Sequence, residues 1–288
     1  NEDLDRIKKI NVQGFNHVVI PLTFPAGESG KDLEAALDEI CDTCEKAIAD
    51  GCTVIILSDR NLPPDKAPIP ALLGVAAVNR RLANVGKRTS SGIIVESGEP
   101  REVMHLCLLL GYGATAVNPY LAFETIAAMA LGKQLSKNFS AAEAIEKYIK
   151  ALCKGLLKTM SKMGISTLRS YRSAQVFQAV GLNSDIVEKY FTGTASQIEG
   201  IGMEDIAAEA NERHREAHNS SPDAPVILWS GGHYKFRMDG ERHLWTPDSV
   251  FYLQEAVKRN DHDLYRKFAE LINDQAEKQS TLRGLFSF

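Results

Sequence analysis

The sequence lacks the short motifs that mark the common nucleotide-binding and hydrolytic enzymes. Its 288 residues contain no G-x-G-x-x-G fingerprint, no P-loop and no G-x-S-x-G nucleophile turn. The one glycine pair of interest, Gly111 and Gly113, is too short for a dinucleotide site. It also precedes an expected strand, whereas the fingerprint follows one. We therefore predict no catalytic residue in this chain.

The chain also lacks a basic excess and a long apolar run. Its formal net charge is −4, which argues against a general nucleic-acid binder but leaves a local basic patch open. No uninterrupted apolar run approaches the roughly 18 residues of a membrane span. The opening "NEDLDRIKKI" is polar and is no signal peptide. We expect a cytoplasmic protein without nucleic-acid or membrane partners. Because an initiator Met is missing, we also expect a chain processed or cut from a longer one.

Cysteine is scarce, with five residues, an odd number. This usage predicts buried thiols in a reducing compartment and no disulfide framework. Cys41 and Cys44 form a C-x-x-C pair, but they fall in mid-helix without a second pair, so core thiols are favoured over a metal or redox site. His214 and His218 have the i, i+4 spacing of metal ligands, yet their charged neighbours favour a solvated helix face. We predict no metal site.

Strand and helix patterns alternate through the first half of the chain. β-branched and apolar runs predict strands at 17–24, 52–57, 90–97 and 114–121, and helical spacing predicts helices at 30–51, 71–86 and 100–113. This alternation predicts an α/β fold with a mostly parallel sheet and flanking helices. The continuous apolar strands are typical of a sheet covered on both faces.

The second half is mainly helical. Ser140 and Glu143 have the spacing of a capping box at the start of a long helix. The polar, proline-containing stretch 219–225 predicts a boundary between a domain at 1–218 and a segment at 219–288. That segment begins with an irregular hairpin turning at Asp239-Gly240, and two amphipathic helices follow.

Polar residues follow several predicted strands, at the sheet edge where α/β proteins bind ligands. Ser58, Asp59 and Arg60 end one strand before a stiff loop that contains four prolines. Two interpretations stay open: Asp59 braces this loop while pairing with Arg60, or the strand end faces a ligand or passage. Glu96-Ser97-Gly98-Glu99 and Asn118-Pro119-Tyr120 end two other strands and are predicted to share the same rim.

A second polar cluster lies farther along, and it includes Ser166, Thr167 and Arg169. Its hydroxyl and guanidinium groups could hold an anion. A polar connection between two elements is the favoured interpretation.

Four long strings carry a family resemblance. "LSDRNLPPDKAPIPALLGVAAVNRRL", "SGEPREVMHLCLLLGYGATAVNPYLAFETI", "KMGISTLRSYRSAQVFQAVGL" and "GGHYKFRMDGERHLWTPDSVFYLQEAV" are similar to the central region of the large subunit of glutamate synthase. The resemblance extends over essentially the whole chain, in the same order. The strings are long and chemically unusual, and this makes the resemblance specific although none of them is a catalytic signature.

The resemblance implies a connecting role within a larger enzyme. In the family, an amidotransferase domain releases ammonia from glutamine, and the ammonia travels through a tunnel to a domain with FMN and a 3Fe–4S cluster. There it is incorporated into 2-oxoglutarate to give glutamate. The central domain joins these two domains and is similar to an incomplete FMN-type (β/α) barrel. The segment 219–288 then corresponds to a linker and the lead-in to the FMN domain.

The same resemblance sets our expectations for this chain. We expect no cofactor and no activity in it, FMN and the cluster being bound elsewhere in the parent enzyme. We also expect a reductase small subunit or ferredoxin to be a further partner of that enzyme. Ser58, Asp59 and Arg60 match the strand end near the ammonia passage, and with Ser166, Thr167 and Arg169 they are our tunnel or interface candidates. The alternatives are a free-standing barrel-like enzyme that binds phosphate or flavin, and a purely structural docking module. The electron donor and oligomeric state stay open.

Overall fold

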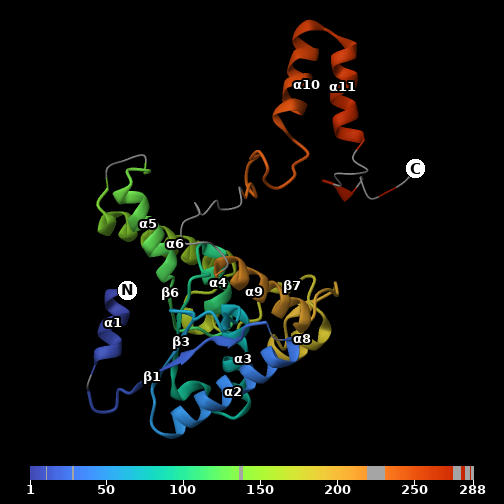
Figure 1. The fold of residues 1–288 in the computed structure, drawn as a ribbon. Helices are drawn as coiled ribbons and strands as arrows, with labels where there is room; N and C mark the ends of the chain where they lie inside the picture. Colours follow the sequence, from blue (N-terminus) through green and yellow to red (C-terminus); the bar gives the residue numbers. More distant parts are fainter. Residues whose placement is uncertain are drawn as a thin grey trace. The chain divides into compact units, whose positions relative to one another are not determined.

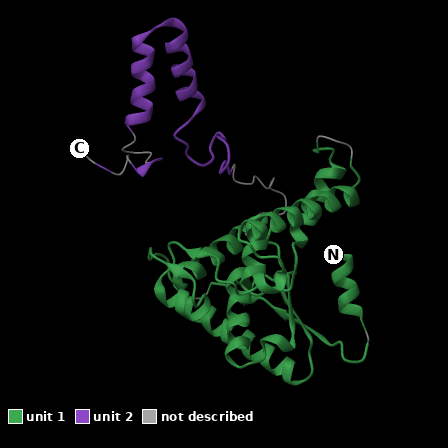
Figure 2. Cartoon of the chain, turned by 180° about the vertical axis from the view of Figure 1, so that it is seen from behind, with its two compact units in different colours: residues 1–219 green, residues 220–288 purple. Residues whose placement is uncertain are grey.

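The chain forms two compact units, at Asn1–Asn219 and Ser220–Phe288 (Figure 2). The computed structural model describes residues 1–10, 12–27, 29–135, 139–218, 231–274, 280–282 and 286.

A four-stranded sheet forms the centre of the first unit. Its strands are all parallel and lie in chain order, β1 (His17–Pro21), β3 (Val54–Ser58), β5 (Gly92–Glu96) and β6 (Ala116–Asn118). The mostly parallel α/β sheet is therefore as predicted. Among the described residues the sheet stays open, with β1 and β6 at its edges, so the expected likeness to an incomplete barrel stays a prediction.

One face of the sheet carries the main core. The buried side chains of Ile55, Leu57, Ile93 and Val95 point to this face and pack in one apolar cluster with three helices. These helices are α2 (Gly30–Ala49), α3 (Ala71–Asn84) and α4 (Val103–Gly111). Because strand side chains alternate between faces, the remaining apolar residues of the same strands point to the opposite side.

Among the residues that the structure describes, one short helix, α1 (Glu2–Lys9), covers the opposite face. Leu4 of α1 packs on Ile56 and Ile94 in a separate small cluster, and Figure 1 shows α1 across the strands from α2 and α3. Val19 of β1 keeps 43% of its surface exposed. The expectation of two fully covered faces is thus wrong for this face, because the apolar strand pattern does not reveal how many helices cover it.

The first predicted strand, 17–24, divides into two. After β1 the chain leaves the main sheet at Leu22, whose N–H donates to the carbonyl of Ser58 at 2.7 Å. It then forms β2 (Thr23–Pro25), which pairs antiparallel with β4 (Lys66–Pro68). This small sheet ties the proline-containing loop after β3 to the body of the unit.

Two helices follow β6, α5 (Tyr120–Leu131) and α6 (Ala141–Lys162). The capping box predicted for α6 is confirmed, since Ser140 and Glu143 exchange side-chain to backbone hydrogen bonds of 2.9 and 3.3 Å. The helix α6 packs on α4, where Gly155 leaves room for Val103. The helix α5 begins directly after β6, at the carboxyl edge of the sheet.

The rest of the first unit consists of short elements and one longer helix. These are η1 (Arg88–Ser90), α7 (Leu168–Tyr171), β7 (Gln178–Ala179), α8 (Ser184–Tyr190), β8 (Ala195–Ser196) and α9 (Met203–His218). The helix α9 lies against the start of α2. There Glu204 Oε2 accepts the N–H of Gly30 at 2.8 Å, and Asn211 Oδ1 accepts the N–H of Gly27 at 2.8 Å.

In the second unit, α10 (Pro247–Arg259) and α11 (His262–Asn273) pack on each other. Before them, Gly240 N–H donates to the carbonyl of Arg237, so the turn at Asp239-Gly240 is present. The predicted hairpin is wrong over 231–246, where the structure has no strand, and its beginning lies outside the described residues. The amphipathic pair of helices is as predicted.

All five cysteines are free thiols. Cys41, Cys44, Cys52 and Cys107 are buried, as predicted, and burial raises the pKa of Cys41 and of Cys44 to about 12. Cys153 is exposed on α6, so the prediction of a buried thiol is wrong there. Cys153 is not among the buried residues of α6. A single cysteine in a helical pattern does not reveal which face of the helix will be buried.

Candidate functional site

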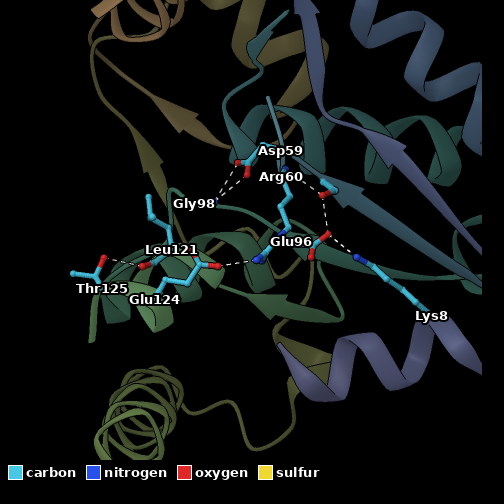
Figure 3. A network of polar contacts seen from close by, with 9 residues as sticks. Lys8, Asp59, Arg60, Glu96, Gly98, Leu121, Glu124 and Thr125 are labelled. Carbon is cyan, nitrogen blue, oxygen red and sulfur yellow. Dashed lines mark hydrogen bonds and ion pairs between the residues drawn. The ribbon is translucent and has the colours of Figure 1, made fainter. Parts of the chain in front are cut away.

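The carboxyl ends of β3, β5 and β6 meet in one polar row facing α1. In register, Ser58 of β3 lies beside Glu96 of β5, and Glu96 lies beside Asn118 of β6. The Ser58 hydroxyl donates to Glu96 Oε2 at 2.7 Å, and the ammonium of Lys8 in α1 donates to the same oxygen at 2.9 Å (Figure 3). All three strand-end residues are buried. The N-terminal helix is thus joined to the strand ends by one ion pair.

Asp59, the next residue after Ser58, points to the other face and is 3% exposed. Its carboxylate accepts hydrogen bonds from the Ser97 hydroxyl, from the Gly98 N–H at 3.0 and 3.3 Å, and from the Tyr120 hydroxyl. Burial nevertheless raises the pKa of Asp59 above its ordinary value, because desolvation outweighs these hydrogen bonds. One carboxylate therefore links the ends of β3 and β5 to the start of α5.

Arg60 turns away from Asp59. Its Nη2 lies 2.7 Å from Oε1 of Glu124 in α5 (Figure 3). Its guanidinium lies over the Tyr120 ring, 4.5 Å from the centroid. The interpretation in which Arg60 pairs with Asp59 is therefore wrong. Arg60 holds β3 to α5. Asp59 and Glu96 are bound by other groups, Asp59 by Ser97 and Gly98, and Glu96 by Ser58 and Lys8.

A cavity of about 630 Å³ opens beyond this edge, on the side of Asp59. It lies between the first turns of α3, α4 and α5 and the last turns of α9. Its charged and titratable lining consists of Asp59, Glu99, Arg101, His105, Arg213, His214 and His218, with Tyr120 beside them. The rim predicted from the strand ends is present, since residues after β3, β5 and β6 all reach this cavity.

Glu99 caps the start of α3 from across the cavity. Its Oε2 accepts the N–H of Ala71 at 2.7 Å, at a helix whose N-cap, Pro70, has no capping side chain. Surrounding protein atoms desolvate the carboxylate and raise the pKa of Glu99, while Arg213 and Arg101 act in the opposite direction. The open cavity still leaves its side chain exposed to solvent.

Ser166, Thr167 and Arg169 lie elsewhere. They are exposed at the turn that begins α7, where Thr167 caps the helix by accepting the N–H of Ser170 at 3.2 Å. Directly after α7, Arg172 reaches Thr115, the residue that precedes β6, at 3.3 Å. This cluster is therefore at the amino edge of the sheet, and the structure does not bring it together with Ser58, Asp59 and Arg60.

The histidine pair on α9 differs from expectation. His214 is buried against the proline-containing loop, with Nε2 2.9 Å from the carbonyl of Pro64, so its predicted solvated face is wrong. The His218 ring lies close to it at a tilt of 54°, with ring centroids 4.3 Å apart. Among the described residues, no three of His, Cys, Asp and Glu gather as metal ligands do. Across the same ranges, no helix has the length and apolarity needed to cross a membrane.

The sequence offered no signal for several residues of this region. Lys8, Glu124 and Arg213 are charged residues in polar stretches of the sequence, a pattern that ordinarily indicates a solvated face. Each reaches the site only through tertiary packing. The cavity between α9 and the strand ends was likewise not predicted, although the residues that end each strand were.

Comparisons with known proteins agree on one family. The family model for the glutamate synthase central domain matches residues 1–183. The large chain of NADPH glutamate synthase from Bacillus subtilis (strain 168) is 44% identical over 258 residues, which are 90% of this chain and 17% of that protein. The NADH glutamate synthase of Schizosaccharomyces pombe is 35% identical over 270 residues, 93% of this chain and 13% of that protein.

Ferredoxin-dependent relatives match as well, and the one from Antithamnion sp. is 32% identical over 291 residues, 98% of this chain and 19% of that protein. The chain thus spans less than a fifth of each of these relatives. A solved double mutant of flavocytochrome b2 with pyruvate bound has a TM-score of 0.36 and 16% identity, over 65% of this chain and 54% of that one. Because the family model matches more than half of its length, the chain belongs to the family of glutamate synthase central domains.

Proposed function

We propose that this chain is the connecting domain of a glutamate synthase large chain and has no catalysis of its own. Its relatives are named glutamate synthases and are several times longer than the chain. In the parent enzyme it joins an amidotransferase domain, which releases ammonia from glutamine, to a domain that reductively incorporates that ammonia into 2-oxoglutarate. FMN and a 3Fe–4S cluster belong to the parent outside this chain. Electrons come from a reductase subunit or from ferredoxin. We place the parent enzyme in the cytoplasm.

We further propose that the carboxyl edge of the sheet forms part of the wall of the ammonia passage. The observation that carries this proposal is the hydrogen bonding of Asp59, which fixes β3, β5 and α5 to one another through Ser97, Gly98 and Tyr120. A wall that confines a small neutral molecule must keep water out and must not open transiently. The buried carboxylate supplies this rigidity where three segments meet.

The chemistry of the edge suits passage better than capture. Conduction requires binding sites that are weak enough to release what they hold. Asp59 already accepts hydrogen bonds from three groups, so little of its acceptor capacity remains for ammonia. Facing α1, Asn118 Oδ1 is buried and accepts no hydrogen bond from the described residues.

The remaining parts fit the same proposal. Four parallel strands in chain order, with α2, α3 and α4 on one face, are the arrangement expected if the sheet derives from part of a (β/α) barrel. We propose that residues 219–288 act as linker and lead-in to the FMN domain. For Ser166, Thr167 and Arg169, exposed at the amino edge, an interface with a neighbouring domain is the remaining role.

The test is the coupling of the two reactions in the parent enzyme. Asp59→Asn keeps the size of the side chain but cannot accept the same set of hydrogen bonds. We expect more glutamine hydrolysed per glutamate formed, because ammonia escapes from a loosened wall. Asp50→Asn, at the exposed end of α2, is the matched control and should leave the ratio unchanged. An unchanged ratio in a folded Asp59→Asn enzyme would refute the wall assignment while leaving the connecting role in place.

A flavin titration of the isolated chain tests the connecting role. We expect no tight FMN binding and no glutamate from glutamine, 2-oxoglutarate and a reductant. Stoichiometric FMN binding would contradict the proposal and favour the flavin-binding alternative, with Arg60 and Arg169 as the first phosphate-binding candidates. If mutations along the whole sheet edge left the coupling ratio intact, a purely structural docking module would be the better description.

A further inference from the structure

The 630 Å³ cavity beside Asp59 has the size and position of a small-molecule site. Ligand sites in proteins occupy roughly 300–1,000 Å³ and combine apolar walls with a few polar groups. In parallel α/β sheets they lie beyond the carboxyl ends of the strands. This cavity meets each of these conditions, and every residue that lines it belongs to the first unit.

Charges of both signs face the cavity in equal number. Two acids, Asp59 and Glu99, line it together with two arginines, Arg101 and Arg213. Of the acids, Glu99 is the one open to a ligand, since it is solvent-exposed and its Oε1 accepts no hydrogen bond from the described residues. Arg101 and Arg213 are both near enough to Glu99 to influence it electrostatically. A positive and a negative binding group therefore lie within the reach of one small molecule.

The rest of the wall is mainly apolar. Leu62, Leu72, Leu108 and Leu121 contribute to it from four different segments, the loop after β3 and the helices α3, α4 and α5. An aliphatic group entering the cavity would bury apolar surface against these leucines, at about 25 cal/mol per Å² removed from water. The site thus favours a ligand that has an apolar part as well as charges.

The charge pattern discriminates among ligand classes. A simple anion would be attracted by the arginines but repelled by Asp59 and Glu99, and a simple amine would meet the opposite conflict. A molecule with both a cation and an anion satisfies both pairs at once. We propose that this cavity binds a small zwitterion with an apolar side chain, a free aliphatic α-amino acid, whose ammonium pairs with Glu99 and whose carboxylate pairs with Arg213 and Arg101.

Calorimetric titration of the full chain tests the proposal with L-leucine and its two halves. The halves are 3-methylbutylamine, which lacks the carboxylate, and 4-methylpentanoate, which lacks the amine. We expect L-leucine to bind with a Kd of about 1 mM or tighter. Each half should bind at least about tenfold more weakly, since losing one charge-assisted contact costs a factor of about ten or more. L-serine, which lacks the apolar part, should also bind more weakly.

Variants locate the site. Glu99→Gln retains an oxygen for the Ala71 N–H, so α3 keeps its cap, and it should weaken L-leucine binding about tenfold or more. Arg213→Gln should do the same. Arg215→Gln is the matched control on the same helix, because Arg215 is exposed and does not line the cavity. Hydrogen exchange at the Gly98 and Ala71 amides should slow when L-leucine binds.

Three outcomes would overturn the assignment. The first is no heat and no exchange protection with L-leucine at millimolar concentration. The second is equal affinity for L-leucine and for either half, which would remove the need for a zwitterion. The third is binding that Glu99→Gln and Arg213→Gln leave unchanged in folded protein, which would place L-leucine somewhere else.

Discussion

The ion pair between Lys8 and Glu96 should contribute much of the free energy that holds α1 against the sheet. The two groups are 2.9 Å apart, and their side chains are 26% and 5% exposed. Removing one member of a buried pair typically costs about 3–5 kcal/mol, because the other charge stays buried without its partner. Solvent reaches Lys8, and Ser58 still donates to Glu96, so both effects reduce the cost. For Lys8→Ala we expect a loss of about 2 kcal/mol in unfolding free energy.

A double-mutant cycle separates the pair from its surroundings. Glu96→Gln removes the buried charge, so the double variant should be less destabilised than the sum of the two single variants, by about 1 kcal/mol or more. The assay is hydrogen exchange of the β3 and β5 amides, and Lys9→Ala, an exposed neighbour on α1, is the control. Equal exchange in Lys8→Ala and Lys9→Ala would refute the reasoning.

The other predictions concern packing, thiol reactivity and pH. Leu4→Ala should speed the same exchange, costing about 2–3 kcal/mol, since Leu4 is buried against two strands. At pH 8, iodoacetamide should label Cys153 first and Cys153→Ser should lose this label, while buried Cys41, with its pKa raised to about 12, reacts only on unfolding. Gly30→Ala should destabilise the unit by about 1–3 kcal/mol, because its Cβ would lie 2.6 Å from the Glu204 nitrogen, and urea unfolding followed by circular dichroism measures it. Because the pKa of Asp59 is raised above 3.8, its ionisation lowers stability as the pH rises through the folded pKa, and Asp59→Asn should flatten that part of the stability profile.

The sequence was informative about features that depend on local pattern. The alternation of strand and helix patterns predicted the parallel sheet. The polar residues that end each strand predicted which residues share the carboxyl edge of the sheet. Their partners were not predictable, because they depend on distant contacts. Lys8 reaches Glu96 across 88 residues, and Arg60 pairs with Glu124 across 64.

Local sequence pattern also did not predict which face of a helix is buried. The charged residues around His214 indicated a solvated face, yet α9 lies so that His214 is buried against the loop that contains Pro64. The same packing carries Arg213 to the cavity. A helix of this composition is compatible with either orientation until the loop against which it packs is known.

The contacts between α9 and the start of α2 have a consequence for the nascent chain on the ribosome. Because the four strands lie in chain order, each can join the sheet as it is synthesised, with little loop closure to delay it. The amides of Gly27 and Gly30 instead wait for partners that are 184 and 174 residues away. Until Glu204 and Asn211 have emerged from the ribosome, the amides at the start of α2 lack these hydrogen bonds. The unit therefore reaches its final folding cooperativity only after its last helix has been synthesised.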